Sequence, residues 1–494
     1  MRSDLTATRF TRNGGWSLLI ARVVLCIGAT LVTAEDRLSA AERPNFVFIL
    51  ADDLGWSDLG CYGSSFHETP NIDRLASEGL RFTQAYTAGA VCSPTRGSIM
   101  TGKYPVRTGV TDYIPGLASE GRKLQTPRTK TELALEEVTL GEALKDGGYQ
   151  TFYAGKWHLG KNEYDADAQG FEIYAGDDEL GNFGQDWKFG DRMTAAALTF
   201  LKTRDTARPF LMYLAYHEPH QPILEYPRHI DHFRAKAEKL PPPQGSTEID
   251  ERNGRTRVVQ NDPAYASEVA GLDEWVGRVL GQLDQTGLAK NTIVIFFSDN
   301  GGLSTKAAPG PTSNQPLRAG KGWLYEGGIR VPLIVRAPGT TKPGSICETP
   351  VISTDLYPTL LGLADLPLRP EQHLDGINVG SLLSGGPAPD RQTLYWHYPH
   401  YHGSTWAPGS AVRYGDWKLI EFFEENTVEL YDLKADFGER TDLAAKNPER
   451  VKSLRAQLAT WRSDTGAVMP RPNPSAGEES GKKAKKAKKR SDKK

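Results

Sequence analysis

The sequence predicts an α/β fold, with a large, mostly parallel central sheet sandwiched by helices and a smaller C-terminal antiparallel sheet plus helix. Continuous apolar runs at 45–50, 209–216 and 292–297 are typical of central strands that are covered on both faces. Segments with helical spacing lie between these runs, and this alternation favours a parallel sheet. After about residue 385 the pattern changes to short strands joined by turns.

Helix signals lie between the predicted strands. Thr69-Pro70 places a capping residue before a proline at the first helical position. Thr139 and Glu142 have the spacing of a capping box. Residues 265–283 keep apolar side chains at helical spacing over about five turns. These segments are therefore expected to cover the two faces of the sheet.

The C-terminal part is expected to form a small α+β subdomain over residues 386–465, after a main domain over 35–385. Its helix begins near Asn447-Pro448. Residues 466–494 are rich in Pro, Gly, Ser and Lys and are predicted to be disordered, because they cannot bury a core. The predicted strands of the subdomain are 394–398, 411–413, 417–420 and 428–431.

The N-terminus is typical of a signal peptide over residues 1–34, with early arginines, an apolar run at 23–32 and a small-residue cleavage site at Val32-Thr33-Ala34. Arg22 interrupts the apolar segment, which is then too short for a stable membrane span. The chain is therefore expected to be exported, to the periplasm or outside the cell.

Charge is divided unevenly along the chain. The net charge is −2, yet residues 482–494 carry nine Lys/Arg and one Asp, so the rest of the chain is acidic. An acidic body argues against a nucleic-acid partner, which needs basic grooves. The tail is either a solvated run or a tether to anionic polysaccharide. The chain has four cysteines, too few for a disulfide framework, and a pairing of Cys61 with Cys347 stays open.

Polar residues follow the predicted strands directly. Asp52 and Asp53 come after the first run, and Asp299 and Asn300 come after the run at 292–297. Because the carboxyl ends of parallel strands share one edge of the sheet, these residues are expected to converge. Carboxylate and amide oxygens suit Ca²⁺ or Mg²⁺ rather than zinc. Either pair taken alone is also compatible with a turn or a helix cap.

Residues 92–96 read Cys-Ser-Pro-Thr-Arg. This run resembles the Cys-x-Pro-x-Arg signature of the type I sulfatases, the arylsulfatase and N-acetylgalactosamine-sulfatase group of the alkaline-phosphatase superfamily. The resemblance continues through Lys156 and His158, His220, and Lys321, and it covers roughly residues 44–445. It implies an alkaline-phosphatase-like fold and hydrolysis of a sulfate monoester.

The resemblance also implies a set of roles. A maturase, the formylglycine-generating enzyme, converts Cys92 to formylglycine, whose hydrated form is the nucleophile. One divalent cation, with Ca²⁺ preferred over Mg²⁺, is expected on Asp52, Asp53, Asp299, Asn300 and the modified Cys92. Catalytic residues beside Cys92 are Arg96, which orders the loop, Lys156 and Lys321 on the sulfate oxygens, Asp299 as base, His220 as acid and His158 in collapse of the intermediate.

Two other functions stay open from the sequence. One is a phosphodiesterase or phosphonate hydrolase of the same superfamily, and the other is a non-catalytic binder of sulfated glycans. The expected substrate is a sulfated carbohydrate. The aromatic and histidine-rich segment 395–402 either stacks on sugar rings or belongs to the core of the small sheet.

Overall fold

The computed structural model describes residues 43–176, 180–181 and 186–476. The predicted signal peptide and most of the predicted tail lie outside these residues. Within them, no helix is both long and apolar enough to cross a membrane.

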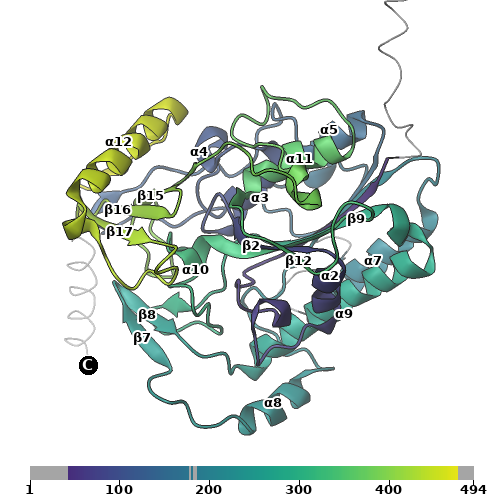
Figure 1. The fold of residues 1–494 in the computed structure, drawn as a ribbon, viewed down its shortest axis with the longest axis horizontal. Coiled ribbons are helices and arrows are strands. Elements are labelled where there is room, and N and C mark those ends of the chain that lie inside the picture. The colour runs from purple at the N-terminus through teal and green to yellow at the C-terminus, as the bar shows by residue number, and fades with distance from the viewer. Residues whose placement is uncertain (1–42, 177–179, 182–185, 477–494) are drawn as a thin grey trace, which may run out of the picture.

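A nine-stranded sheet forms the centre of the protein (Figure 1). Its strand order is β12-β2-β11-β9-β1-β6-β4-β5, and β13 pairs with β2. The strands are β1 Asn45–Ala51, β2 Leu80–Tyr86, β4 Gln150–Gly155, β5 Ile173–Ala175, β6 Phe210–Ala215, β9 Thr292–Ser298, β11 Arg330–Arg336, β12 Ser345–Cys347 and β13 Val351–Ile352.

The three predicted central strands lie side by side. β1 pairs in parallel with β6 on one side and with β9 on the other. β4 and β5 continue the parallel arrangement, whereas β11 is antiparallel to both β9 and β2. The predicted mostly parallel sheet is therefore confirmed.

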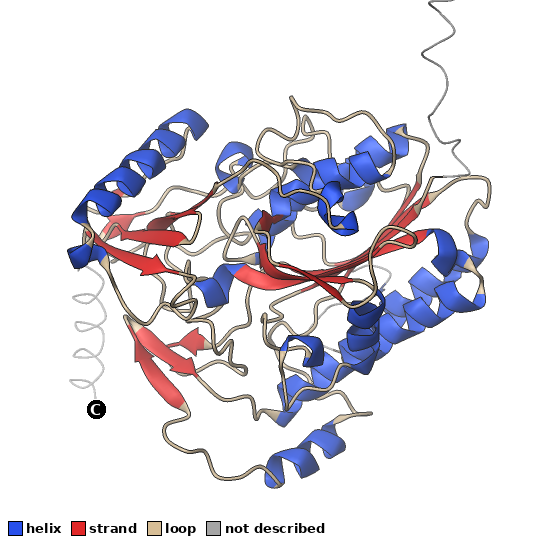
Figure 2. Cartoon of the chain, viewed as in Figure 1, coloured by secondary structure: helices blue, strands red, loops and turns tan. Residues whose placement is uncertain are grey.

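Both faces of this sheet are covered by helices (Figure 2). In β1, Phe46 and Phe48 belong to one hydrophobic core, and Val47 and Ile49 belong to the other. A strand with two buried faces reads as a continuous apolar run, which explains the sequence pattern. The helices on the first face are α3 Cys92–Thr101, α5 Leu140–Asp146 and α11 Leu356–Leu363; those on the second are α2 Pro70–Glu78, α7 Phe189–Thr203 and α9 Pro263–Gln285.

The predicted helix starts differ in detail. The capping box at α5 is present, because the Thr139 hydroxyl accepts from Glu142 N and the Glu142 side chain accepts from Thr139 N. α2 begins at Pro70 as expected, but its cap is not a side-chain cap. The Thr69 hydroxyl instead donates to Asp73 Oδ1 at 3.0 Å.

The C-terminal strands form an antiparallel meander, β14-β15-β16-β17. Leu454 and Leu458 of the helix that follows pack on Val412, Leu419 and Leu430 of the sheet. The elements are β14 Thr393–Tyr398, β15 Gly409–Tyr414, β16 Trp417–Phe422, β17 Thr427–Asp432 and α12 Pro448–Thr465.

A buried ion cluster fastens this meander to the rest of the protein. Lys418 of β16 places Nζ 2.9 Å from Glu326 Oε1 and 2.9 Å from Glu439 Oε1. Glu326 begins the short helix α10, Glu326–Ile329, and accepts a hydrogen bond from Tyr86 of β2. Because all three charged side chains are fully buried, the cluster ties β16 to the central sheet.

Some elements were not anticipated. A second antiparallel sheet has the order β10-β8-β7, with β7 Glu248–Glu251, β8 Gly254–Arg257 and β10 Thr305–Lys306. The expected disorder from residue 466 is wrong for the described part of the tail, because β18 Arg471–Pro472 pairs with β3 Leu124–Gln125. Two further helices are α4 Pro105–Thr108 and α8 Ile230–Glu238.

Candidate active site

The predicted carboxylates meet at the carboxyl edge of the central sheet. Ala51 of β1 lies opposite Ser298 of β9, so the residues that follow each strand are neighbours. Asp53 N donates to Asp299 Oδ1 at 3.2 Å, and Asn300 Nδ2 donates to Asp53 Oδ1 at 2.8 Å. Asp53 has φ of 62°, in the left-handed region that Asp tolerates better than most residues.

Cys92 is the first residue of α3 and lies against this carboxylate group. Its Sγ is 3.4 Å from Asp52 Oδ1 and 3.4 Å from Lys321 Nζ. Burial, followed by the charge of Asp52, raises the pKa of Cys92 to about 12. The unmodified thiol is therefore protonated at neutral pH, which argues against a thiolate nucleophile.

Arg96 lies one helical turn after Cys92, so the two side chains share a face of α3. Its Nε and Nη2 donate to Asp299 Oδ2 at 2.9 and 2.8 Å, and its Nη1 donates to the carbonyl of Lys156. Nη2 also lies 3.5 Å from Asp52 Oδ2. The planar guanidinium thus connects the first turn of α3 to both strand ends.

Two lysines contact the two aspartates that follow β1. Lys156, just after β4, places its ammonium on Asp52 Oδ2, and Lys321 Nζ lies 2.6 Å from Asp53 Oδ1. Burial alone would lower the pKa of Lys156, but the charge of Asp52 outweighs it and leaves the pKa above its usual value. Both lysines therefore carry positive charge beside Cys92.

The two aspartates nearest Arg96 differ in their pKa. Burial opposes ionisation of Asp52, but the Lys156 ammonium outweighs it and holds the pKa of Asp52 well below its usual range. Burial, followed by the charge of Asp52, raises the pKa of Asp299 to about 7. Asp52 is therefore ionised at neutral pH, whereas Asp299 takes up a proton more readily.

The two predicted histidines occupy different environments. His220 Nε2 lies 3.8 Å from Asp53 Oδ2, and its side chain is 27% exposed. His158 is half-buried, with Nε2 2.8 Å from the carbonyl of Ile114. Burial, with Lys156 as the next cause, lowers the pKa of His158 to about 3, and burial followed by Lys321 lowers that of His220 to about 4.

The donor set fits a hard divalent cation. One ligand atom each from Asp52, Asp53, Cys92 and His220 lies within 4.8 Å of the others. Asn300 Oδ1 is buried and has no hydrogen-bond partner in the described part of the chain. A buried amide oxygen left in this way is accounted for by a cation, since such atoms are otherwise paired. His220, expected as an acid, is also placed among the possible ligands.

A buried cluster that no sequence motif indicates lies behind Asp53. Tyr265 OH donates to Asp58 Oδ2 at 2.6 Å and lies 3.3 Å from the Asp53 carbonyl. Gly55 N and the Thr312 hydroxyl also donate to Asp58, at 2.8 and 2.7 Å. These bonds hold the turn that follows β1. The residues come from distant parts of the chain, so no local motif announces them.

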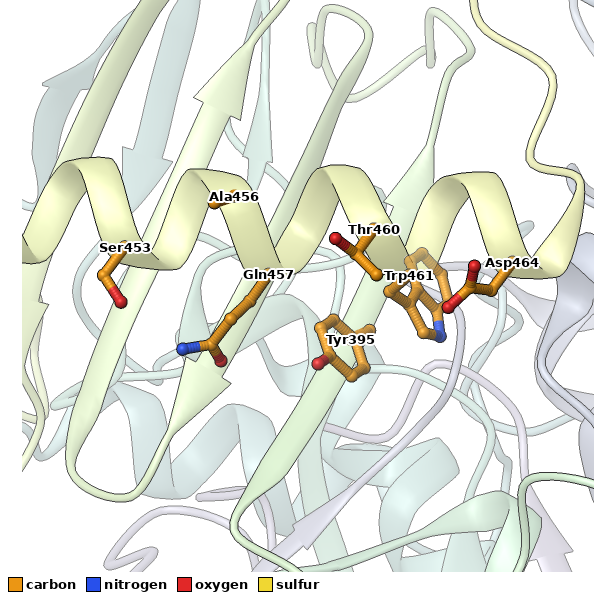
Figure 3. A pocket seen from close by; sticks show the side chains of 7 residues that line it. All are labelled: Tyr395, Ser453, Ala456, Gln457, Thr460, Trp461 and Asp464. Atoms are coloured by element: carbon orange, nitrogen blue, oxygen red, sulfur yellow. The ribbon is translucent and has the colours of Figure 1, made fainter.

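The aromatic segment 395–402 is mostly core. Trp396, Tyr398 and Tyr401 are buried, whereas Tyr395 and His402 are half-buried. Tyr395 stacks on Trp461 of α12 at 4.9 Å between ring centroids, and both rings line a pocket of about 460 Å³ (Figure 3). That pocket contains none of the predicted catalytic residues. The remaining residues that line it are Ser453, Ala456, Gln457, Thr460 and Asp464.

Two cysteines of the described residues lie outside the site. Cys61 and Cys347 are both free, so the pairing left open by the sequence is absent from the described residues.

Comparison with known proteins agrees with the fold. A family model described as Sulfatase matches residues 44–366, and one described as N-sulphoglucosamine sulphohydrolase, C-terminal, matches residues 319–464. A sulfatase of Formosa agariphila is 34% identical, with 90% of this chain and 93% of that protein covered. Arylsulfatase A of Homo sapiens is 32% identical, with 89% and 91% covered.

Among solved structures, Ps i-CgsB in complex with k-i-k-neocarrahexaose aligns with a TM-score of 0.69 at 26% identity, covering 86% of this chain and 93% of that one. Fold and site together define a hydrolase of the alkaline-phosphatase superfamily. The chain belongs to the sulfatase family within it, the type I sulfatases, and is a sulfuric ester hydrolase.

Proposed function

We propose that this chain is an exported, formylglycine-dependent sulfatase that hydrolyses a sulfate monoester on a carbohydrate to an alcohol and inorganic sulfate. The observation that carries the proposal is the position of Cys92. It opens α3 between Asp52 and Lys321, one turn before the Arg96 fork. A buried, protonated thiol is inert as it stands, so its place at the centre of six charged groups is best explained by its conversion.

The nucleophile depends on that conversion. Formylglycine supplies a hydrated aldehyde, in which one hydroxyl is a nucleophile and the other allows sulfate to leave with return of the aldehyde. Arg96 keeps the first turn of α3 in register with Asp299 through its two bonds to Oδ2. Asp299, which these bonds hold beside the first turn of α3, takes the proton of the attacking hydroxyl.

A divalent cation, Ca²⁺ in preference to Mg²⁺, is proposed on Asp52, Asp53, Asp299 and Asn300, with residue 92 completing the set. When bound, the ion supplies positive charge that lowers the pKa of a nearby hydroxyl and polarises sulfate oxygens. Asp299 Oδ1 and Oδ2 already accept hydrogen bonds, but a carboxylate oxygen has more than one lone pair and can still be a ligand.

The remaining side chains handle the sulfate and the leaving alcohol. Lys156 and Lys321 provide ammonium groups for the three sulfate oxygens, since Lys156 pairs with Asp52, which contacts Cys92, and Lys321 contacts Cys92 directly. His220, whose side chain is 27% exposed, gives a proton to the leaving oxygen. His158 assists release of sulfate from the buried side.

The carbohydrate assignment rests on the relatives. N-acetylgalactosamine-6-sulfatase of Canis lupus familiaris is 30% identical over 86% of this chain, and the aligned Ps i-CgsB structure holds a carrageenan oligosaccharide. Export, the formylglycine-generating maturase and a division into catalytic domain, small subdomain and basic tail complete the proposal. The signal peptide that would direct export lies outside the described residues.

The test is hydrolysis by protein that has been co-expressed with a formylglycine-generating enzyme and supplied with Ca²⁺. We expect release of sulfate from 4-nitrophenyl sulfate and from sulfated sugars, and no turnover by Cys92→Ala, which has no sulfur or oxygen on Cβ from which the aldehyde could form. Lys156→Ala and His220→Ala should each lose about 100-fold or more in kcat.

Other outcomes select the alternatives. Faster hydrolysis of a phosphodiester or phosphonate than of every sulfate would favour a phosphoesterase. Binding of sulfated glycan without turnover, with the aldehyde installed, would favour a non-catalytic binder. Near wild-type turnover by Lys156→Ala would refute the role given to that lysine.

A further inference from the structure

One lysine beside the site is not used by the proposed chemistry. Lys306 is half-buried at the end of β10, and its Nζ lies 3.3 Å from Gln221 Oε1. Gln221 directly follows His220 and accepts from the His220 ring at its own carbonyl. In the described part of the chain, Lys306 forms no ion pair with a carboxylate. The Lys306 ammonium is partly removed from water and contacts an amide oxygen, so no negative charge among the described residues offsets the cost of burying it.

Lys306 lies on the solvent side of the site. Cys92, Asp52 and Asp299 are at most 1% exposed, whereas the His220 side chain is 27% exposed. The leaving alcohol must therefore extend past His220. Gln221 follows His220, Lys306 contacts Gln221, and all three residues are partly exposed, so a sugar that extends past His220 approaches the Lys306 ammonium.

The loop after β14 closes the same side. Gly322, next to Lys321, packs so closely on this loop that an added Cβ would lie 2.2 Å from His402 Nδ1. His402 also meets the ring of Tyr113 edge-on at 5.7 Å between centroids. Burial first, and then the charges of Lys321 and Lys306, lower the pKa of His402 to about 3, so its ring is neutral.

The charged side chains of the inner site pair with one another. Asp52, Asp53 and Asp299 face Arg96, Lys156 and Lys321. Lys306 lies outside this set and adds a positive charge near the neutral His402. An approaching sugar that carries only the reacting sulfate would leave this charge without a counter-ion.

We propose that Lys306, flanked by Gln221 and His402, is a specificity-determining residue that binds a second anionic group, a sulfate or a carboxylate, on the sugar that carries the reacting sulfate or on its neighbour. The inference rests on the proposed sulfatase function and narrows its substrate class to polyanionic carbohydrates. An ammonium–anion contact in a half-buried place is stronger than a neutral hydrogen bond and gives selectivity as well as affinity.

The test compares kcat/KM for three sugars: N-acetylgalactosamine with one sulfate, the same sugar with two sulfates, and the singly sulfated sugar linked to a uronic acid. We expect the wild type to prefer one of the dianionic substrates by about 10- to 100-fold. Lys306→Met should abolish that preference, and Lys306→Arg should restore most of it. Lys202→Met, on an exposed lysine of α7, is the matched control and should keep the wild-type preference.

The three substrates distinguish a second sulfate from a carboxylate. They also distinguish failure of this inference from failure of the proposed sulfatase function. Preference for the disulfated sugar identifies sulfate, and preference for the uronate identifies carboxylate. Equal kcat/KM for all three sugars, or an unchanged preference in Lys306→Met, would overturn the inference while sulfate release still upheld the sulfatase function. No sulfate release from any of them or from 4-nitrophenyl sulfate, with the aldehyde installed, would overturn both.

Discussion

Replacing Lys418 with Met tests how the C-terminal meander is attached. The Lys418 ammonium lies 2.9 Å from a carboxylate oxygen of Glu326 and 2.9 Å from one of Glu439, and none of the three side chains is exposed. Methionine has a similar length but no charge, so the carboxylate of Glu326 would lose its main partner in a water-free place. Removing one partner of a buried ion pair typically costs about 3–5 kcal/mol.

A loss of that size is a large part of the roughly 5–15 kcal/mol by which folded domains are stable. The assay is urea denaturation of Lys418→Met beside the wild type, followed by far-UV circular dichroism. The matched control is Lys434→Met, an exposed lysine in the same subdomain, which should change the free energy of unfolding by less than about 0.5 kcal/mol. A loss below about 1 kcal/mol for Lys418→Met would refute the view that this cluster secures the meander.

Three further predictions concern the site and its pH dependence. Arg96→Lys should lower kcat on 4-nitrophenyl sulfate by about 100-fold or more, because one ammonium cannot reproduce the paired bonds to Asp299, and near wild-type turnover would contradict this. Asn300→Leu should weaken Ca²⁺ binding by about 10- to 100-fold in a calorimetric titration, since it removes a buried oxygen that has no hydrogen-bond partner among the described residues, and unchanged affinity would exclude Asn300 as a ligand. Burial, against the opposing charge of Lys418, raises the pKa of Glu439 from 4.5 to about 7, so its stabilising protonated form is lost as the pH rises through that window. Glu439→Gln, which cannot ionise, should therefore gain stability relative to the wild type between pH 5 and pH 8, and a parallel pH profile for the two proteins would contradict it.

The central sheet could be predicted because β1, β6 and β9 are buried on both faces and so appear as unbroken apolar runs. The strand β7 could not, since its sequence, Glu-Ile-Asp-Glu, lacks a hydrophobic face that burial would require. The same limit explains the tail, where β18 consists of Arg471 and Pro472 and pairs through its backbone alone.

For the site, the sequence predicted that Asp52 and Asp299 converge at the carboxyl edge of the sheet, because parallel strands end there. The structure adds that their strands, β1 and β9, are neighbours. It could not identify Tyr265, which contacts the Asp53 carbonyl from a helix more than two hundred positions away. Nor could the sequence show that His402 is half-buried whereas the aromatic residues before it are mostly buried, because the exposure of His402 depends on how it packs against Gly322.

The state of Cys92 tests the central claim most directly. The measurement is the mass of the tryptic peptide that contains Cys92, from protein co-expressed with a formylglycine-generating enzyme. The account predicts a peptide lighter than the thiol form by about 18 Da, the difference between a thiol and an aldehyde at this carbon. An unmodified thiol, despite a maturase that converts a control sulfatase in the same cells, would contradict it.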